Sequence, residues 1–169
     1  MKQLRNKKKK RRNTTADNME WRFAEPNDFE WIKKASMEHH KKSDWSEVEY
    51  SEEKCDKYIR AAINDPYYFG IIAEKDEERI GFMAGRLLEY YFSRERYARQ
   101  VDLYVVPEHR NGMAGIFMMR KFIEWAKMRG ALEVYFEPRL SDEAIKKFDA
   151  MARRLGMEHF ANAYRRKLT

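Results

Sequence analysis

The stretch "VDLYVVPEHRNGMAGIFMMRKFIEWAKMRG", Val101–Gly130, decides the fold of this chain. An apolar run ends at Pro107, and Asn111-Gly112 follows. Asn-Gly between apolar runs is the strongest short hairpin signal, but it requires alternating residues on both sides. The downstream apolar residues instead recur every three or four positions, at Ile116, Met119, Phe122, Ile123 and Ala126. The stretch therefore predicts a strand, a turn and a helix that ends at Gly130.

The start of this helix has the features of an anion-binding site. The first backbone N–H groups of a helix have no intrahelical acceptor, and the helix dipole adds positive potential. Gly112, Ala114 and Gly115 leave the backbone accessible, and Arg110 adds a permanent charge. The turn has neither the Gly-Lys-Ser/Thr of a Walker A loop nor a full G-x-G-x-x-G. The residues alone leave two interpretations open, a phosphate cradle and a connection that binds no ligand.

The remaining pattern predicts one α/β domain over residues 19–169. Strands are expected at Trp21–Phe23, on both sides of the turn Lys75–Glu78, at Tyr97–Val106, at Leu132–Glu137 and, in one or two pieces, within Met157–Leu168. Helices are expected from Asn27 or Asp28, from Ser51, at Met113–Arg129 and at Ser141–Leu155. A strand, a helix and a strand surround the opening stretch, so these two strands should be parallel neighbours. The result is a mixed sheet with helices on both faces.

The positive charge of the chain lies in its first residues. The net charge is +7, and residues 1–19 hold eight Lys/Arg and one acidic residue, so the rest of the chain is neutral. We interpret residues 1–18 as a basic, disordered arm, in which residues 2–12 contact nucleic acid by neutralising phosphates. The alternatives are a solvated tail and an extension before a start at Met19. The arm has no aromatic residue to stack on bases, so sequence-specific recognition is not indicated.

Several classes of protein and site are not indicated by the composition. The single cysteine, Cys55, excludes an internal disulfide framework and favours a reducing, cytoplasmic setting. No apolar run reaches the ~18 residues of a membrane span, and the basic start lacks the apolar core of a secretory signal. His39 and His40 have no acidic or cysteine partner at ligand spacing, so we interpret them as solvated residues at a helix end rather than metal ligands.

Three segments together resemble the GNAT-type N-acetyltransferases. The segment "VVPEHRNGMAGIFMMRKFIEWAKMRGALEV" resembles their acetyl-CoA signature, V-x-P-x-x-R-G-x-G-x-G followed by a helix, a glycine and a strand. The start "WRFAEPNDFEWI" and the end "ARRLGMEHFANAYRRKL" are also similar to the family, so the resemblance covers residues 20–168. It implies a mostly antiparallel mixed sheet in which the parallel fourth and fifth strands splay apart. Chains of this length and style are frequent among phage-encoded members, which implies the host cytoplasm or the virion.

The resemblance implies an acetyl-CoA site without a metal. Its cofactor-binding positions would be Leu103, Val105, Val106, Arg110, Asn111, Gly112, Met113, Ala114, Gly115 and Ser141. Two positions depart from the signature, because Asn111 stands where the first glycine is common and Met113 where the second is expected. The Met113 side chain must point away from the pyrophosphate, or the cradle is narrowed.

The resemblance also implies catalytic roles. Asp102 is the one carboxylate within the fourth strand and the best candidate for a base, directly or through water; its alternative role is a salt-bridged strand residue. The tyrosine that often protonates the leaving thiolate is replaced by Phe148 or, in another register, by Ala152. The catalytic candidate Tyr104, or else Tyr135 or Tyr164, would substitute, unless the thiolate leaves unaided or the site is weak or inactive.

The acceptor is predicted only as a primary amine of a small molecule or protein. Trp45, Tyr90 and Tyr91 are the candidates for contacting it, and the alternative for the two tyrosines is that they simply end a hairpin. The alternative function is a catalytically weak or inactive GNAT-scaffold protein that acts through its basic arm as a nucleic-acid-associated or virion component. A homodimer is a further expectation.

Overall fold

The computed structural model of the protein describes residues 18–110, 112–138, 142–161, 166 and 168. The chain divides into two compact units, Met1–Glu137 and Pro138–Thr169. The predicted arm, Asn111, Ser141 and Tyr164 lie outside the described residues, so the predictions made for them stay predictions.

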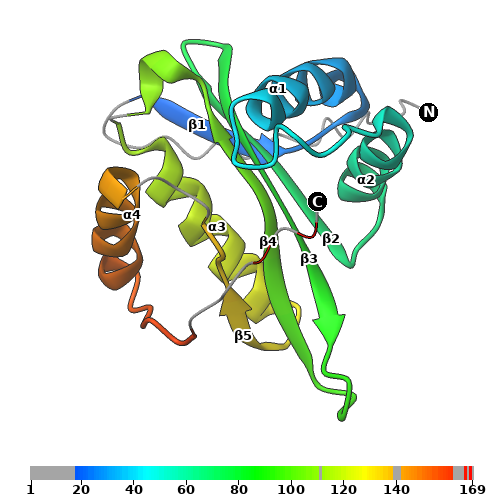
Figure 1. Ribbon diagram of the computed structural model, residues 1–169, viewed down its shortest axis with the longest axis vertical. Helices are drawn as coiled ribbons and strands as arrows, with labels where there is room; N and C mark the ends of the chain where they lie inside the picture. Colours follow the sequence, from blue (N-terminus) through cyan, green and yellow to red (C-terminus); the bar gives the residue numbers. More distant parts are fainter. Residues whose placement is uncertain (1–17, 111, 139–141, 162–165, 167, 169) are drawn as a thin grey trace, which may run out of the picture. The chain divides into compact units, whose positions relative to one another are not determined.

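The first unit is a five-stranded sheet with three long helices (Figure 1). Its elements in chain order are β1 (Met19–Phe23), α1 (Phe29–Lys41), α2 (Glu52–Asn64), β2 (Tyr68–Lys75), β3 (Glu78–Glu89), β4 (Arg96–Val105), α3 (Ala114–Met128) and β5 (Ala131–Tyr135). The strands lie in the order β1-β2-β3-β4-β5, and only the pair β4-β5 is parallel. The crossover predicted from the opening stretch is confirmed.

Residues that were predicted to begin or end helices and strands do so in the structure. Ser51 caps α2, because its side chain accepts a hydrogen bond from the backbone N–H of Lys54. Asp76 and Glu77 make the tight turn between β2 and β3, with φ values of 50° and 67°. Gly130 has a φ of 74°, which a glycine adopts without strain, and it ends the helix α3 as predicted.

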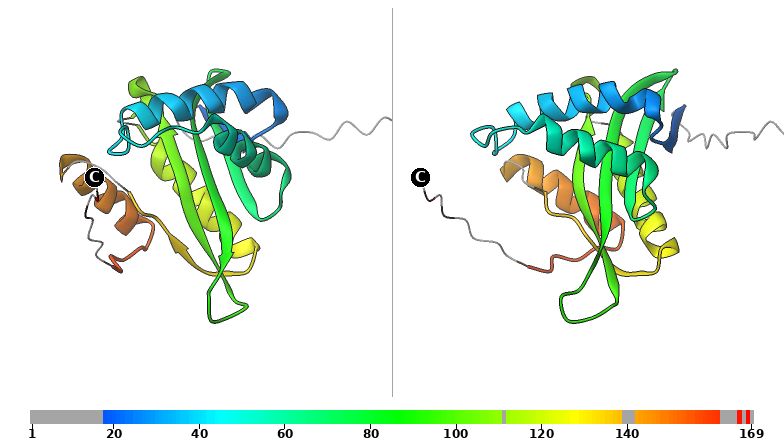
Figure 2. Two further views of the ribbon diagram at one scale, coloured as in Figure 1. Left: turned by 45° about the vertical axis from the view of Figure 1, so that its right-hand side comes forward. Right: turned by 90° about the vertical axis from the view of Figure 1, so that its right-hand side faces the viewer.

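Helices cover both faces of the sheet, with α1 and α2 on one side and α3 on the other (Figure 2). The core under α3 joins Phe117, Met118, Phe122 and Trp125 to sheet residues such as Phe69, Met83 and Ala98. The core under α1 and α2 joins Ile32, Ala35 and Ile59 to Ile72, Phe82 and Tyr104. The alternation of side chains along each strand supplies both cores.

The helix α3 lies very close to β3. An added Cβ at Gly85 would come within 2.4 Å of the Phe122 ring, so a larger residue would push the helix off the sheet. The Phe122 ring also stacks on Trp125 and contacts Phe69. This packing sets how closely α3 approaches β3.

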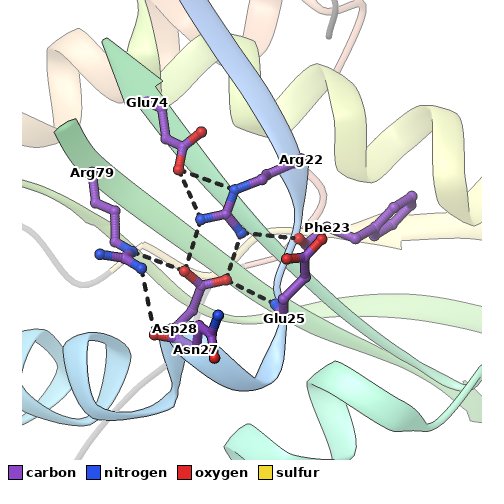
Figure 3. A network of polar contacts seen from close by, with 7 residues as sticks. All are labelled: Arg22, Phe23, Glu25, Asn27, Asp28, Glu74 and Arg79. Carbon is purple, nitrogen blue, oxygen red and sulfur yellow. Dashed lines mark hydrogen bonds and ion pairs between the residues drawn. The ribbon is translucent and has the colours of Figure 1, made fainter. Parts of the chain in front are cut away.

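A buried carboxylate ties the start of α1 to the sheet (Figure 3). The Asp28 side chain is fully buried and accepts hydrogen bonds from Arg22 of β1, at 2.8 Å, and Arg79 of β3, also at 2.8 Å. It also accepts one from the backbone N–H of Glu25, and Arg22 reaches Glu74 of β2 as well. Asp28 directly precedes α1, as predicted, but its side chain binds these partners instead of capping that helix.

The second unit contains α4 (Asp142–Arg154), which ends at Gly156 with a φ of 75°. The helix prediction is confirmed. The one or two strands predicted within Met157–Leu168 do not include residues 157–161, which the structure shows without strand conformation, and residues 162–165 and 167 lie outside the described residues. A strand needs backbone hydrogen-bond partners from a neighbouring chain segment, and residues 157–161 pair with no strand among the described residues.

Candidate active site

The strand β4 has an open edge along its second half. Its parallel pairing with β5 ends at Arg99↔Tyr135, although β4 continues to Val105. Among the described residues, no strand pairs with Gln100–Val105 on this side, while the other side remains paired with β3. Backbone N–H and C=O groups at such an edge are available to an extended ligand.

The start of α3 lies directly after this edge in the chain. A short 3-10 helix at Pro107–His109 connects the two, and the Gly112 N–H is bonded to His109 O at 3.1 Å. The first helical hydrogen bond of α3 is donated by the backbone N–H of Phe117 to Met113 O, at 3.0 Å. The N–H groups of the first turn therefore have no helical acceptor, as predicted.

The substitution at Met113 is compatible with an open turn. Its side chain is 48% exposed, at the residue that precedes α3. An added Cβ at Gly112 would lie 3.3 Å from His109 O, a tight contact that would require a small shift of the turn. Gly115 and Ala114 lie in the first turn of the helix.

Arg110 is held at the end of β4. Its Nε donates a hydrogen bond to the Val105 carbonyl at 2.9 Å, and its guanidinium lies 5.8 Å from the centre of the Tyr104 ring. The residue is exposed, so its remaining N–H groups can bind an anion.

The residues of β4 alternate between the two faces. Leu103 and Val105 pack against the core under α3, and Tyr104 belongs to the core under α1 and α2. Asp102 lies on the side of Tyr104, where it lines a cavity under α1 and α2. The two predicted catalytic residues, Asp102 and Tyr104, therefore face α1 and α2, whereas α3 lies on the opposite face of the sheet. The open edge of β4 lies between these two faces.

The structure adds His39 to these catalytic candidates. Its Nδ1 lies 2.9 Å from Asp102 Oδ1, and its ring centre is 5.6 Å from that of Tyr104. The side chains of His39 and Asp102 are 37% and 24% exposed, so solvent or a substrate can reach the pair. The interpretation of His39 as merely a solvated residue is wrong. Its spacing from Ile32 and Ala35 places it on the buried face of α1, and this signal was present in the sequence.

The surroundings of Tyr104 favour its protonated hydroxyl. Burial raises the pKa of its hydroxyl, and nearby Glu38 acts in the same direction, whereas Arg110 lowers the pKa. The hydroxyl is therefore protonated at neutral pH. The other described candidate, Tyr135, instead bonds through its hydroxyl to Glu133 at 2.6 Å, which raises its pKa.

The three predicted acceptor contacts are not brought together. Tyr90 and Tyr91 lie at the end of the β3–β4 hairpin, where the Tyr90 hydroxyl donates to Glu133 and Tyr91 is fully exposed. Ala84, the partner of Asp102 across β3, is six residues away along the strand from Tyr90, which corresponds to roughly 20 Å. Trp45 lies in the loop after α1 and is 46% exposed.

No three His, Cys, Asp or Glu side chains of the described residues gather as a metal site would require. None of the helices in the described part of the chain is both long enough and apolar enough to cross a membrane.

Solved structures with the same fold include proteins of different kinds. An aminoglycoside acetyltransferase from an uncultured soil metagenomic sample, in complex with sisomicin, has a TM-score of 0.65 at 15% identity, covering 90% of this chain and 97% of that chain. A ribosomal-protein-alanine N-acetyltransferase from Brucella melitensis biovar Abortus 2308 has a TM-score of 0.63 at 13% identity, over 89% and 99% of the two chains. A transcriptional regulator from Bacillus halodurans C-125 has a TM-score of 0.68 at 17% identity, over 89% and 99%. At these identities the likeness concerns the fold alone.

The sequence comparison is more specific about the family. No curated protein matches the chain. The sequence pattern of the acetyltransferase (GNAT) family, however, matches residues 20–155, which is most of the chain and spans the open edge of β4 and the turn before α3. The chain belongs to the acetyltransferase (GNAT) family.

Proposed function

We propose that the protein is an acetyl-CoA-dependent N-acetyltransferase that acetylates a primary amine. The observation that carries this proposal is that the β4–β5 pairing ends at Arg99↔Tyr135, before β4 itself ends. The chain then continues to the start of α3, where the backbone N–H groups have no helical acceptor. An extended pantetheine chain fits an open strand edge, and a pyrophosphate fits a helix N-terminus. These two features follow each other in the order in which the two parts of coenzyme A are joined.

The residues present fit the coenzyme. The backbone of Leu103, Val105 and Val106 would bond the pantetheine, and an N–H near Val105 or Val106 would stabilise charge that develops on the thioester oxygen. Arg110, Gly112 and the first turn of α3 would hold the pyrophosphate. Met113, which is half exposed, would have to turn its side chain away from the pyrophosphate.

The chemistry requires a neutral amine and a route for its proton. Acetyl-CoA supplies the acetyl group as a thioester. Asp102 accepts the amine proton, either directly or through the His39 ring that it contacts, and the amine nitrogen bonds to the acetyl carbon. The carbon–sulfur bond breaks, and Tyr104 or a water protonates the thiolate that leaves.

Calorimetry with acetyl-CoA tests the proposed function. We expect binding at sub-millimolar concentration, accompanied by release of free coenzyme A thiol when an accepted amine is added. A protein that binds neither acetyl-CoA nor coenzyme A at that concentration would overturn the proposal.

The substitution Gly115→Val tests the first turn of α3 directly. We expect acetyl-CoA affinity to fall by at least about tenfold, because a branched side chain would occupy the approach of the pyrophosphate to the helix N–H groups. Lys127→Val, at the exposed far end of α3, is the matched control and should leave affinity unchanged. Equal affinity for both variants would remove Gly115 from the site.

A second role is favoured by the position of the positive charge in residues 1–18. We infer that the arm contacts nucleic acid through phosphates and delivers the domain to its target, in the cytoplasm of a host or in a virion if the chain is phage-encoded. Deleting residues 1–18 is expected to abolish salt-sensitive DNA binding while acetyl-CoA affinity stays the same. Unchanged DNA affinity after the deletion would exclude this role. A homodimer also remains a prediction, which sedimentation can test.

A further inference from the structure

A cavity of about 90 Å³ lies between the sheet and the helices α1 and α2. Most of its lining is apolar, and includes Ile32, Ile59, Phe82 and Val101. A water molecule takes roughly 30 Å³ of liquid and needs polar partners, so an apolar space of this size holds a small hydrocarbon group better than water. The catalytic candidate Asp102 lines the same cavity.

Asp102 is the charged residue of the cavity lining. Its side chain is 24% exposed, so the cavity is accessible to solvent at this residue. A group that enters here would place its apolar part inside and keep its polar part next to Asp102. An amine at that position is within reach of the proposed proton acceptor.

Arg86 supplies a positive charge on the face of the sheet that carries the cavity. It follows Ala84 by two residues on β3, so it projects from the same face, and Ala84 is both a lining residue and the cross-strand partner of Asp102. Its charge also acts on Tyr58 of α2, another lining residue. Arg86 is therefore a neighbour of the lining residues Ala84 and Tyr58, although it is not part of the lining itself.

The charge of Arg86 is uncompensated. No carboxylate among the described residues pairs with it, and its Nε, like the Tyr58 hydroxyl, is buried without a hydrogen-bond partner. Such groups cost about 1–3 kcal/mol each when they are left unpaired, so an anion that binds the guanidinium would be favoured. The neighbouring arginine across the strand, Arg99, differs because it pairs with Glu137 at 2.5 Å.

We propose that the acceptor is a small amino acid with an aliphatic side chain, whose amine binds beside Asp102, whose carboxylate binds Arg86 and whose side chain enters the cavity. The negative charge of Asp102 and the positive charge of Arg86 complement the two charges of a zwitterion. The assignment of the amine rests on the proposed acetyl transfer. The carboxylate and the side chain rest on the cavity and Arg86 alone.

Three probes with the same branched hydrocarbon group separate these contributions. L-leucine has the amine and the carboxylate, 3-methylbutylamine lacks the carboxylate, and 4-methylpentanoic acid lacks the amine. With the full chain and acetyl-CoA, we expect kcat/KM for leucine to exceed that for 3-methylbutylamine by about 10- to 100-fold, as for one charge-assisted hydrogen bond. Arg86→Gln should abolish this preference because kcat/KM falls far more for leucine than for 3-methylbutylamine, and Arg86→Lys should restore part of it. Arg99→Gln is the matched control and should keep the preference.

Calorimetry of leucine and of 4-methylpentanoic acid without coenzyme separates the two proposals. We expect both to bind, and both to bind about 10- to 100-fold more weakly to the Arg86→Gln protein. If they bind in this way but no amine is acetylated and acetyl-CoA does not bind, the acetyltransferase proposal fails while the amino acid site stands. Equal rates with leucine and 3-methylbutylamine, an equal loss for both in Arg86→Gln, or absent binding of both carboxylates would overturn the amino acid site.

Discussion

Asp102→Asn is expected to lower the turnover number by about 100- to 10,000-fold, the usual contribution of a positioned general base. The amide keeps the shape of the side chain and can still contact His39 Nδ1, which lies 2.9 Å from the carboxylate oxygen. It cannot take up a proton or stabilise a charged imidazole. Acetyl-CoA affinity should stay close to that of the wild type, because the predicted coenzyme contacts are backbone groups of β4 and the first turn of α3.

The measurement combines steady-state rates across pH 6–9 with calorimetry of acetyl-CoA. Asp76→Asn, in the exposed turn between β2 and β3, makes the same chemical change away from the site and should behave as the wild type. His39→Gln separates the two proton routes. A large loss in this variant indicates transfer through the imidazole, and a small loss indicates direct transfer to Asp102. Wild-type turnover of Asp102→Asn over the whole pH range would exclude Asp102 from the site.

Asp28→Asn is expected to lower the free energy of unfolding by about 3–5 kcal/mol, the usual effect of removing one partner of a buried ion pair. Asp28 is fully buried, and the change leaves both Arg22 and Arg79 without their carboxylate. Because these contacts join β1, β3 and the start of α1, their loss should also loosen the helix that carries His39. Urea unfolding followed by circular dichroism measures the effect. The control is Glu53→Gln, which removes an exposed pair with Lys57 and should cost at most about 1 kcal/mol.

The same carboxylate gives a pH dependence. Burial raises the pKa of Asp28, but hydrogen bonds from Arg22, the Glu25 backbone and Arg79 outweigh it and lower the pKa from 3.8 to about 2. Because the folded value is the lower one, this stabilisation is present above pH 4 and is lost as the pH falls toward 2. It amounts to about 2 kcal/mol, an order-of-magnitude figure. Equal acid sensitivity of wild type and Asp28→Asn between pH 2 and 4 would contradict this account.

The secondary structure around the site could be predicted from the sequence. The strand, the turn and the helix in Val101–Gly130 follow from a change of hydrophobic period and from residues such as Pro107 and Gly130, all of which act over a few neighbouring positions. The parallel pairing of β4 and β5 follows because a strand–helix–strand connection returns the chain in the same direction.

The predictions that differ from the structure concern contacts between distant residues. The terminal strand was expected from the pattern "MEHFANAYRRKL", but a strand exists only where a neighbouring segment supplies hydrogen-bond partners, and residues 157–161 have none among the described strands. For Tyr90 and Tyr91 the sequence left two interpretations open, contact with the acceptor and the end of a hairpin. The structure places them at the end of the β3–β4 hairpin, away from Asp102.

The sequence by itself determined the order of the elements, the turn after β4, the start of α3 and the family resemblance, because these depend on residues close together in the chain. Only the tertiary structure decided that His39 contacts Asp102, 63 residues away, and that Asp28 is held by Arg22 and Arg79. It also decided that Arg86, which pairs with no carboxylate among the described residues, lies on the face of the sheet that carries the apolar cavity. Such contacts depend on the strand register and on where α1 and α2 pack on the sheet, and no local pattern of residues specifies either.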